Sequence, residues 1–124
     1  MIDDVKIVTI SVADQDKSLE FYTKKLGFKT VTDQPLGSGS RWIELKVPKT
    51  GTHIALASLP GKEPVAGKMS SVVFSCQDVD RTYEELKKRG VEFVQPPVKE
   101  HWGTSALFKD PDGTIFCLSG RSNR

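Results

Sequence analysis

The sequence predicts an α+β fold of two tandem βαβββ modules, whose sheets together form a curved mixed β-sheet cleft. The first observation behind this prediction is an internal repeat, in which Ser11 and Asp14 recur as Ser75 and Asp78 within two runs of similar pattern. The second is that each copy continues with the same order of helix-like and strand-like segments. One module alone leaves a sheet face uncovered, and two together can form a concave surface.

Each copy begins with a strand and a helix. Apolar and polar residues alternate from Val8 to Val12, which is typical of a half-buried strand. Asp14 and Asp78 each precede a helical pattern, where a short carboxylate can accept hydrogen bonds from the first free N–H groups. A glycine follows each helix and suits the left-handed conformation at its C-terminal end. The strand-like runs that follow are residues 28–32, 41–47 and 52–57 in the first copy and residues 91–94, 104–108 and 114–119 in the second.

The chain of 124 residues has the length of one domain. We expect a single domain over residues 1–124, divided into module 1 (about 1–58), a linker rich in proline and glycine (59–67) and module 2 (about 68–121). Hydrophobic residues make up 37% of the chain and charged residues 27%, which is the balance of a soluble globular protein with a buried core.

Charge and cysteine content exclude several classes of partner. The net charge is +2 with both signs interspersed, so we expect no nucleic-acid partner. The chain has neither a signal-peptide pattern at its start nor an apolar run approaching the ~18 residues that span a bilayer, so we expect no membrane partner. Its two cysteines, Cys76 and Cys117, cannot frame a disulfide scaffold, which favours a cytoplasmic location with reduced thiols.

Two motifs add a family resemblance to this pattern. The run D-x-x-x-S-x-x-F-Y-x-x-x-L-G-F from Asp14 and the D-P-D-G segment from Asp110 resemble the vicinal oxygen chelate superfamily. That superfamily has the glyoxalase/bleomycin resistance/dihydroxybiphenyl dioxygenase-like fold, and includes glyoxalase I, extradiol dioxygenases, fosfomycin-resistance enzymes and bleomycin-binding proteins. The resemblance covers almost the whole chain. It implies the fold but no single activity, because this superfamily hosts several chemistries.

The resemblance also implies where a metal would be bound. In metal-dependent relatives, four symmetry-related strand positions carry histidine, glutamate or glutamine and point into the concave face. The corresponding residues of this chain are Ile7, Ala55, Ser71 and Cys117. Two of these side chains are hydrocarbon, serine is a poor ligand, and one thiolate cannot hold a divalent ion alone. We therefore expect no metal and no other cofactor.

His53 and Glu44 are weak candidates for catalytic residues. His53 shares a strand face with Ala55, and could contact a ligand, act as a general base or serve as a displaced metal ligand. It could equally be a histidine at the start of a strand that touches only water. Glu44 alternates with Trp42 and Lys46, so that Trp42 could be a stacking wall and Glu44 an acceptor or base. The alternative for Glu44 is a surface carboxylate beside Lys46.

The second module supplies further candidates for the lining of a pocket. His101 could meet His53 across the cleft or be solvated. Trp102 and Phe108 could form a pocket wall or belong to the core. Cys117 could face the cavity as a reactive thiol or be buried and inert. The residues expected to bind a ligand are Thr9, Ser11, Trp42, Glu44, His53, Ala55, Ser71, Val73, His101, Trp102, Phe108 and Cys117.

The leading functional hypothesis is a glyoxalase/bleomycin-resistance-family protein that binds a small organic molecule in its concave cleft without a metal. Drug-sequestering relatives work this way, often as homodimers, and we expect a homodimer here. One alternative is a metal-dependent glyoxalase I-like lyase or isomerase, or a dioxygenase, with an off-pattern divalent metal site at His53 and Glu44 or His101. Two others are metal-free acid–base catalysis by Glu44 or His53, and a structural or regulatory dimer with a vestigial cleft.

Overall fold

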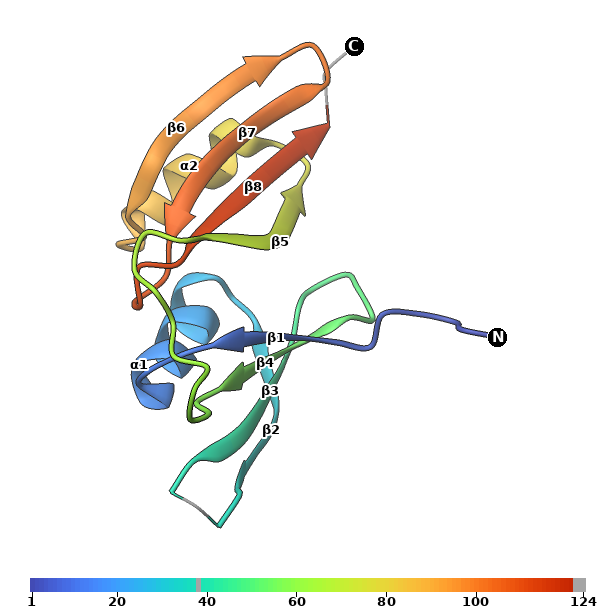
Figure 1. Ribbon diagram of the computed structural model, residues 1–124. Coiled ribbons are helices and arrows are strands. Elements are labelled where there is room, and N and C mark those ends of the chain that lie inside the picture. The colour runs from blue at the N-terminus through green and yellow to red at the C-terminus, as the bar shows by residue number, and fades with distance from the viewer. Residues whose placement is uncertain (38, 122–124) are drawn as a thin grey trace. The chain divides into compact units, whose positions relative to one another are not determined.

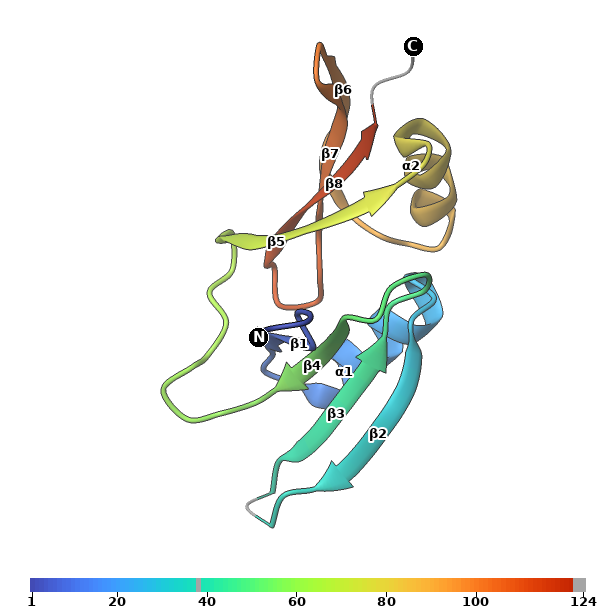
Figure 2. The same ribbon diagram turned by 90° about the vertical axis from the view of Figure 1, so that its right-hand side faces the viewer.

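The computed structural model describes residues 1–37 and 39–121 (Figures 1 and 2). The chain divides into two compact units, Met1–Pro64 and Val65–Arg124, which we call the first and second units. Each unit contains one βαβββ module with a four-stranded mixed sheet, so the predicted α+β fold of two tandem modules is confirmed. Within the described residues, no helix is both long enough and apolar enough to cross a membrane.

The first unit has the sheet order β1-β4-β3-β2, with β1 parallel to β4 and the other neighbours antiparallel. Its helical segment follows β1, and the strands β2, β3 and β4 come after it. The elements are β1 (Ile7–Ser11), α1 (Gln15–Glu20), η1 (Phe21–Lys25), β2 (Lys29–Pro35), β3 (Arg41–Lys46) and β4 (His53–Ala57).

The second unit repeats this arrangement with the order β5-β8-β7-β6, in which β5 is parallel to β8. The pairing of Thr9 with Ala55 in the first sheet has its counterpart in the pairing of Val73 with Cys117 in the second. The elements are β5 (Met69–Cys76), α2 (Val79–Lys88), β6 (Phe93–Glu100), β7 (Gly103–Lys109) and β8 (Ile115–Arg121).

The predicted signals at the helix ends act as expected. The side chain of Asp14 accepts a hydrogen bond from the backbone N–H of Lys17 at 3.1 Å, and Asp78 does the same for Arg81 at 3.1 Å. Gly27 follows the first helical segment with a φ of 82°, a conformation that favours glycine. The structure differs from the predicted single regular helix in one respect, because α1 continues into the π-helical turn η1.

One strand in the second unit is longer than predicted. The sequence pattern placed a strand over residues 91–94 and stopped before Pro96 and Pro97, but β6 continues to Glu100. Because β6 pairs only with β7 and forms the edge of its sheet, the missing proline N–H groups interrupt no ladder on its outer side.

Each unit has its own core between the helix and one face of the sheet. In the first unit, Ile43, Leu45 and Tyr22 are fully buried. In the second unit the core is aromatic, and Phe108 and Phe116 stack with ring centroids 5.8 Å apart. Since strand residues alternate between the two faces, this packing leaves the other face of each sheet free of its own helix. We call this other face the helix-free face.

Gln15 fastens the start of α1 to the first sheet. Its buried side-chain amide donates hydrogen bonds to the carbonyl oxygens of Arg41 at 2.6 Å and Leu56 at 2.9 Å. Its side-chain oxygen accepts a hydrogen bond from the backbone N–H of Arg41 at 2.9 Å. One side chain therefore satisfies backbone groups of both β3 and β4.

We expect the substitution Gln15→Ala to lower the free energy of unfolding by about 2–4 kcal/mol, because it leaves part-buried backbone groups without partners and opens a cavity. Urea denaturation would measure this loss. Gln77→Ala is the matched control, since Gln77 is exposed and its loss should cost less than about 0.5 kcal/mol. Equal effects of the two substitutions would contradict the role given to Gln15.

Candidate functional site

The helix-free face of the first sheet carries polar side chains at its centre. In β3, Ile43 and Leu45 point into the core, so Trp42 and Glu44 lie on the opposite face. Glu44 pairs with Ala55 of β4, and Lys46 pairs with His53. His53 is thus a diagonal neighbour of Glu44 on the same face, close enough for their side chains to meet.

Trp42, Glu44 and His53 form a hydrogen-bonded set that we call the Trp–Glu–His triplet. Nδ1 of His53 is hydrogen-bonded to Oε2 of Glu44. Nε1 of Trp42 donates a hydrogen bond to Oε1 of Glu44 at 3.3 Å. The Glu44 side chain is 14% exposed and that of His53 is 24% exposed, so the pair is shielded from water without being sealed from it. Each carboxylate oxygen of Glu44 therefore has a partner.

The triplet holds Glu44 in its ionised form. The hydrogen bond from His53 lowers the pKa of Glu44 below its ordinary value, partial burial opposes this shift, and the hydrogen bond from Trp42 and the charges of His53 and Lys6 add to it. An ionised carboxylate can only accept hydrogen bonds, so Nδ1 of His53 must carry the proton of their shared bond.

The sequence placed His53 and Glu44 on one face but did not predict that they form a pair. Their contact depends on the register between β3 and β4, which sets Lys46 opposite His53. The alternation in each run was visible in the sequence, whereas the register was not. The structure gives both residues a side-chain partner that was not predicted, and their roles toward a ligand stay predictions.

β1 and β4 supply the rest of this face. Ile7 pairs with His53, Thr9 with Ala55, and Ser11 with Ala57. Thr9 is exposed, while Ala55 is fully buried between its neighbours on β1 and β3. The first unit thus brings together six of the residues expected to bind a ligand: Thr9, Ser11, Trp42, Glu44, His53 and Ala55.

The helix-free face of the second sheet has a different chemistry. Cys117 lies between Val73 of β5 and Leu107 of β7, as Ala55 lies between Thr9 and Glu44 in the first unit. Leu107 therefore takes the place of Glu44, and the described residues of the second unit contain no counterpart of the triplet. Ser71 is exposed and lies where the β5–β8 register shifts.

Phe108 is a correction to the expected pocket wall. It is 1% exposed and belongs to the core of the second unit, with its ring centroid 6.2 Å from that of Phe74 and 5.8 Å from that of Phe93. Alternation along β7 places Phe108 on the helix side with Ala106. Trp102 and His101 are exposed in the turn between β6 and β7, and Trp102 is 55% exposed. A meeting of His101 with His53 stays a prediction.

The four positions that hold metal ligands in metal-dependent relatives do not fit a divalent cation here. Ile7 and Ala55 offer no donor atom, and Ser71 offers only a hydroxyl. Burial raises the pKa of the Cys117 thiol, which disfavours the thiolate that a metal needs. Elsewhere among residues 1–37 and 39–121, no group of three or more histidine, cysteine, aspartate or glutamate side chains is placed to hold a metal ion.

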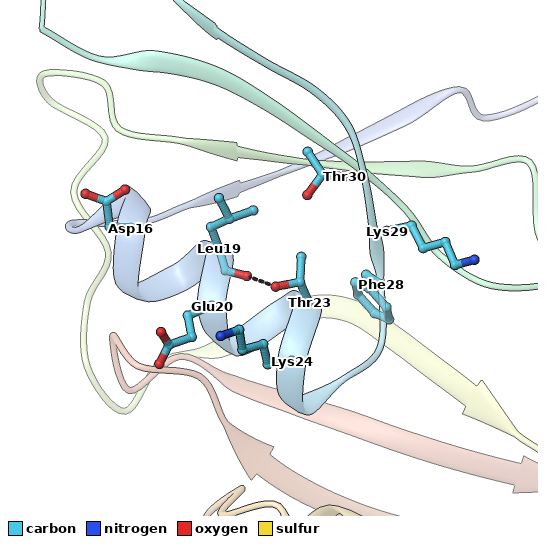
Figure 3. A pocket seen from close by; sticks show the side chains of 8 residues that line it. All are labelled: Asp16, Leu19, Glu20, Thr23, Lys24, Phe28, Lys29 and Thr30. Atoms are coloured by element: carbon cyan, nitrogen blue, oxygen red, sulfur yellow. Dashed lines mark hydrogen bonds between the residues drawn. The ribbon is translucent and has the colours of Figure 1, made fainter.

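A shallow pocket of about 540 Å³ lies beside α1, η1 and the start of β2 (Figure 3). The Thr23 hydroxyl already donates a hydrogen bond to the Leu19 carbonyl oxygen at 2.6 Å, and the acidic and basic side chains around the pocket balance in charge. Its lining residues are Asp16, Leu19, Glu20, Thr23, Lys24, Phe28, Lys29 and Thr30, none of which was expected to bind a ligand.

Comparison with known families agrees with this architecture. Residues 5–118 match the sequence model of the Glyoxalase/Bleomycin resistance protein/Dioxygenase superfamily. The chain belongs to this superfamily. The family match confirms the predicted resemblance, and it covers both units.

Several known proteins are similar to this chain over nearly their whole length. The chain is 37% identical to the uncharacterized protein YetH of Bacillus subtilis, over 95% of this chain and 98% of that protein. TnmS3, an antibiotic binding protein from a Streptomyces species, has a solved structure with a TM-score of 0.85 and 31% identity, covering 98% of both chains. A superfamily member from Sphaerobacter thermophilus has a TM-score of 0.86 and 33% identity, covering 97% of this chain and 98% of that one.

The lowered pKa of Glu44 predicts a pH-dependent contribution to stability. Since the pKa is lower in the folded chain, ionised Glu44 stabilises the fold above its ordinary value of 4.5, and this stabilisation is lost as the pH falls through the folded value. We expect Glu44→Gln to lower the free energy of unfolding by about 1–2 kcal/mol near pH 7 and by progressively less below about pH 4.

Urea denaturation over this pH range would measure the difference between the two proteins. The control is Glu84→Gln, which removes an exposed carboxylate on α2 and should change stability by less than about 0.5 kcal/mol at either pH. A loss for Glu44→Gln that stays constant with pH would show that ionisation of Glu44 is not its cause.

Proposed function

We propose that this protein binds a small, partly aromatic organic molecule on the helix-free face of its first sheet, without a metal. The observation that carries the proposal is the Trp–Glu–His triplet. The Glu44 carboxylate holds the indole of Trp42 by its N–H group, so a flat aromatic surface has a fixed orientation beside a polar edge. Such a pairing of an aromatic wall with few directed polar groups is typical of small-molecule sites.

The metal-free part of the proposal rests on the donor chemistry of the chain. Ile7, Ala55, Ser71 and Cys117 together provide no set of hard or borderline ligands. Glyoxalase-type isomerisation and ring cleavage both require an ion that polarises or gathers vicinal oxygens. Binding without these chemistries is therefore the function that this donor set favours.

The relatives support the same class of function. TnmS3 is described as an antibiotic binding protein and has a similar fold over its full length. We further propose a homodimer, because Met69, Val73 and Trp102 are large apolar residues that are half or more exposed in the second unit. A cytoplasmic location is also proposed, and the free state of Cys76 and Cys117 supports it.

The protein has only two tryptophans, Trp42 and Trp102, which allows a direct test of the binding face. In the variant Trp102→Phe, Trp42 is the sole tryptophan. We expect planar bicyclic aromatic compounds to quench the fluorescence of this variant as strongly as that of the unaltered protein. The substitution Trp42→Ala should weaken binding about tenfold or more, since aromatic contacts carry much of such binding energy. Quenching confined to Trp102 would overturn the placement.

The metal-free proposal is tested by elemental analysis of protein purified without chelator. We expect far less than one equivalent of Zn, Ni, Mn or Fe per chain, because the four positions lack ligands. One tightly held equivalent would favour the alternative, a metal-dependent lyase, isomerase or dioxygenase. Loss of that metal in His53→Leu would then locate an off-pattern site at the triplet.

A further inference from the structure

The inference concerns the edge of the His53 ring that Glu44 does not use. Nδ1 of His53 is bound to Glu44, while Nε2 makes no hydrogen bond to any residue in the described part of the chain. The backbone around this ring is fixed, because the N–H of His53 donates to the carbonyl oxygen of Lys6 at 2.8 Å and β4 is paired on both sides. The ring therefore has one nitrogen, Nδ1, that is hydrogen-bonded to Glu44, and a second nitrogen, Nε2, that can contact a ligand.

The hydrogen bond at Nδ1 of His53 determines whether Nε2 of the same ring is a donor or an acceptor. Both oxygens of Glu44 accept hydrogen bonds, one from Trp42 and one from His53, and an ionised carboxylate has no proton to donate. When the ring is neutral, Nδ1 must therefore carry its hydrogen, and Nε2 then presents a lone pair. A carboxylate that fixes the tautomer of a histidine in this way prepares Nε2 to accept a proton or a hydrogen bond.

The residues around His53 indicate which kind of ligand group would bind at Nε2. The same carboxylate positions the Trp42 ring, so an aromatic surface and a hydrogen-bond acceptor are held together by one residue. Lys46 lies directly opposite His53 in the strand register and is exposed. Its ammonium group can reach a ligand at this edge and favours an oxygen that carries, or can develop, negative charge.

We propose that the triplet recognises hydroxyaryl compounds, whose ring packs on Trp42 and whose hydroxyl group donates a hydrogen bond to Nε2 of His53. This inference rests on the proposed function and gives it a ligand class. If the hydroxyl is acidic, its proton moves to Nε2: the O–H bond breaks, an N–H bond forms, and the electron pair stays on the oxygen beside Lys46. The resulting imidazolium remains paired with Glu44.

The probes that test this are 2-naphthol and 2-methoxynaphthalene, which share a ring system and differ in the ability to donate a hydrogen bond. We expect the unaltered protein to bind 2-naphthol about tenfold more tightly, which is the effect of one good hydrogen bond. Titration calorimetry or Trp42 fluorescence in the Trp102→Phe background would measure both affinities. Equal affinities would overturn the inference while leaving the proposed function intact.

The substitution Glu44→Gln provides the sharper test. A glutamine can still accept from Trp42, but its amide group would donate to Nδ1 and so move the histidine hydrogen to Nε2. We expect the preference for 2-naphthol to disappear, because a hydrogen on Nε2 can be donated to the oxygen of either compound. His53→Leu should give the same result, and Glu84→Gln, which changes an exposed carboxylate on α2 of the second unit, should leave the preference unchanged.

Long-range ¹H–¹⁵N NMR of the histidine rings gives a readout that needs no ligand. We expect neutral His53 to carry its hydrogen on Nδ1 in the unaltered protein and on Nε2 in Glu44→Gln. A hydrogen on Nε2 in the unaltered protein would overturn the inference. If neither naphthalene compound binds at Trp42, both the inference and the proposed function fail. Equal binding of the two compounds would overturn the inference alone.

Discussion

The double hydrogen bonding of the Glu44 carboxylate is the interaction on which the proposed chemistry of this protein depends. One oxygen fixes the indole of Trp42 and the other fixes the imidazole of His53. Partial burial of a carboxylate costs desolvation free energy unless both of its oxygens accept hydrogen bonds. Here Trp42 and His53 donate those hydrogen bonds. These two hydrogen bonds restrict the rotation of the Trp42 and His53 side chains, which rotate freely in an unfolded chain, and they assign a donor to each oxygen of Glu44.

The two units show how one scaffold can diverge in chemistry while its geometry is kept. The strand pairing that joins Thr9, Ala55 and Glu44 in the first sheet recurs around Cys117 in the second. There Leu107 replaces the carboxylate, so the centre of that face carries an apolar side chain in its place. Both sheets keep the same strand order while the chemistry of their helix-free faces differs, so the fold tolerates this divergence.

Patterns of residues close along the chain predict the helices and strands of this fold, but they do not predict the contacts between strands. Asp14 caps its helix as the sequence indicated, because a cap depends on residues close along the chain. The bond between Glu44 and His53 depends on register, which a single strand does not encode. Phe108 was misplaced because an aromatic residue on an alternating strand suits either face. The length of β6 was underestimated because proline signals a break except at an edge.

Pro96 and Pro97 have a consequence for how copies of this protein can associate. They lie in β6, the outermost strand of the second sheet, and neither has a backbone N–H group to offer a further strand. Because successive N–H groups of a strand point to opposite edges, a ladder growing outward from this strand would lack one donor here, and the register with β7 shifts at the same place, between Gln95 and Val98. The missing donor and the irregular register make this border a poor template for pairing with a strand of another chain.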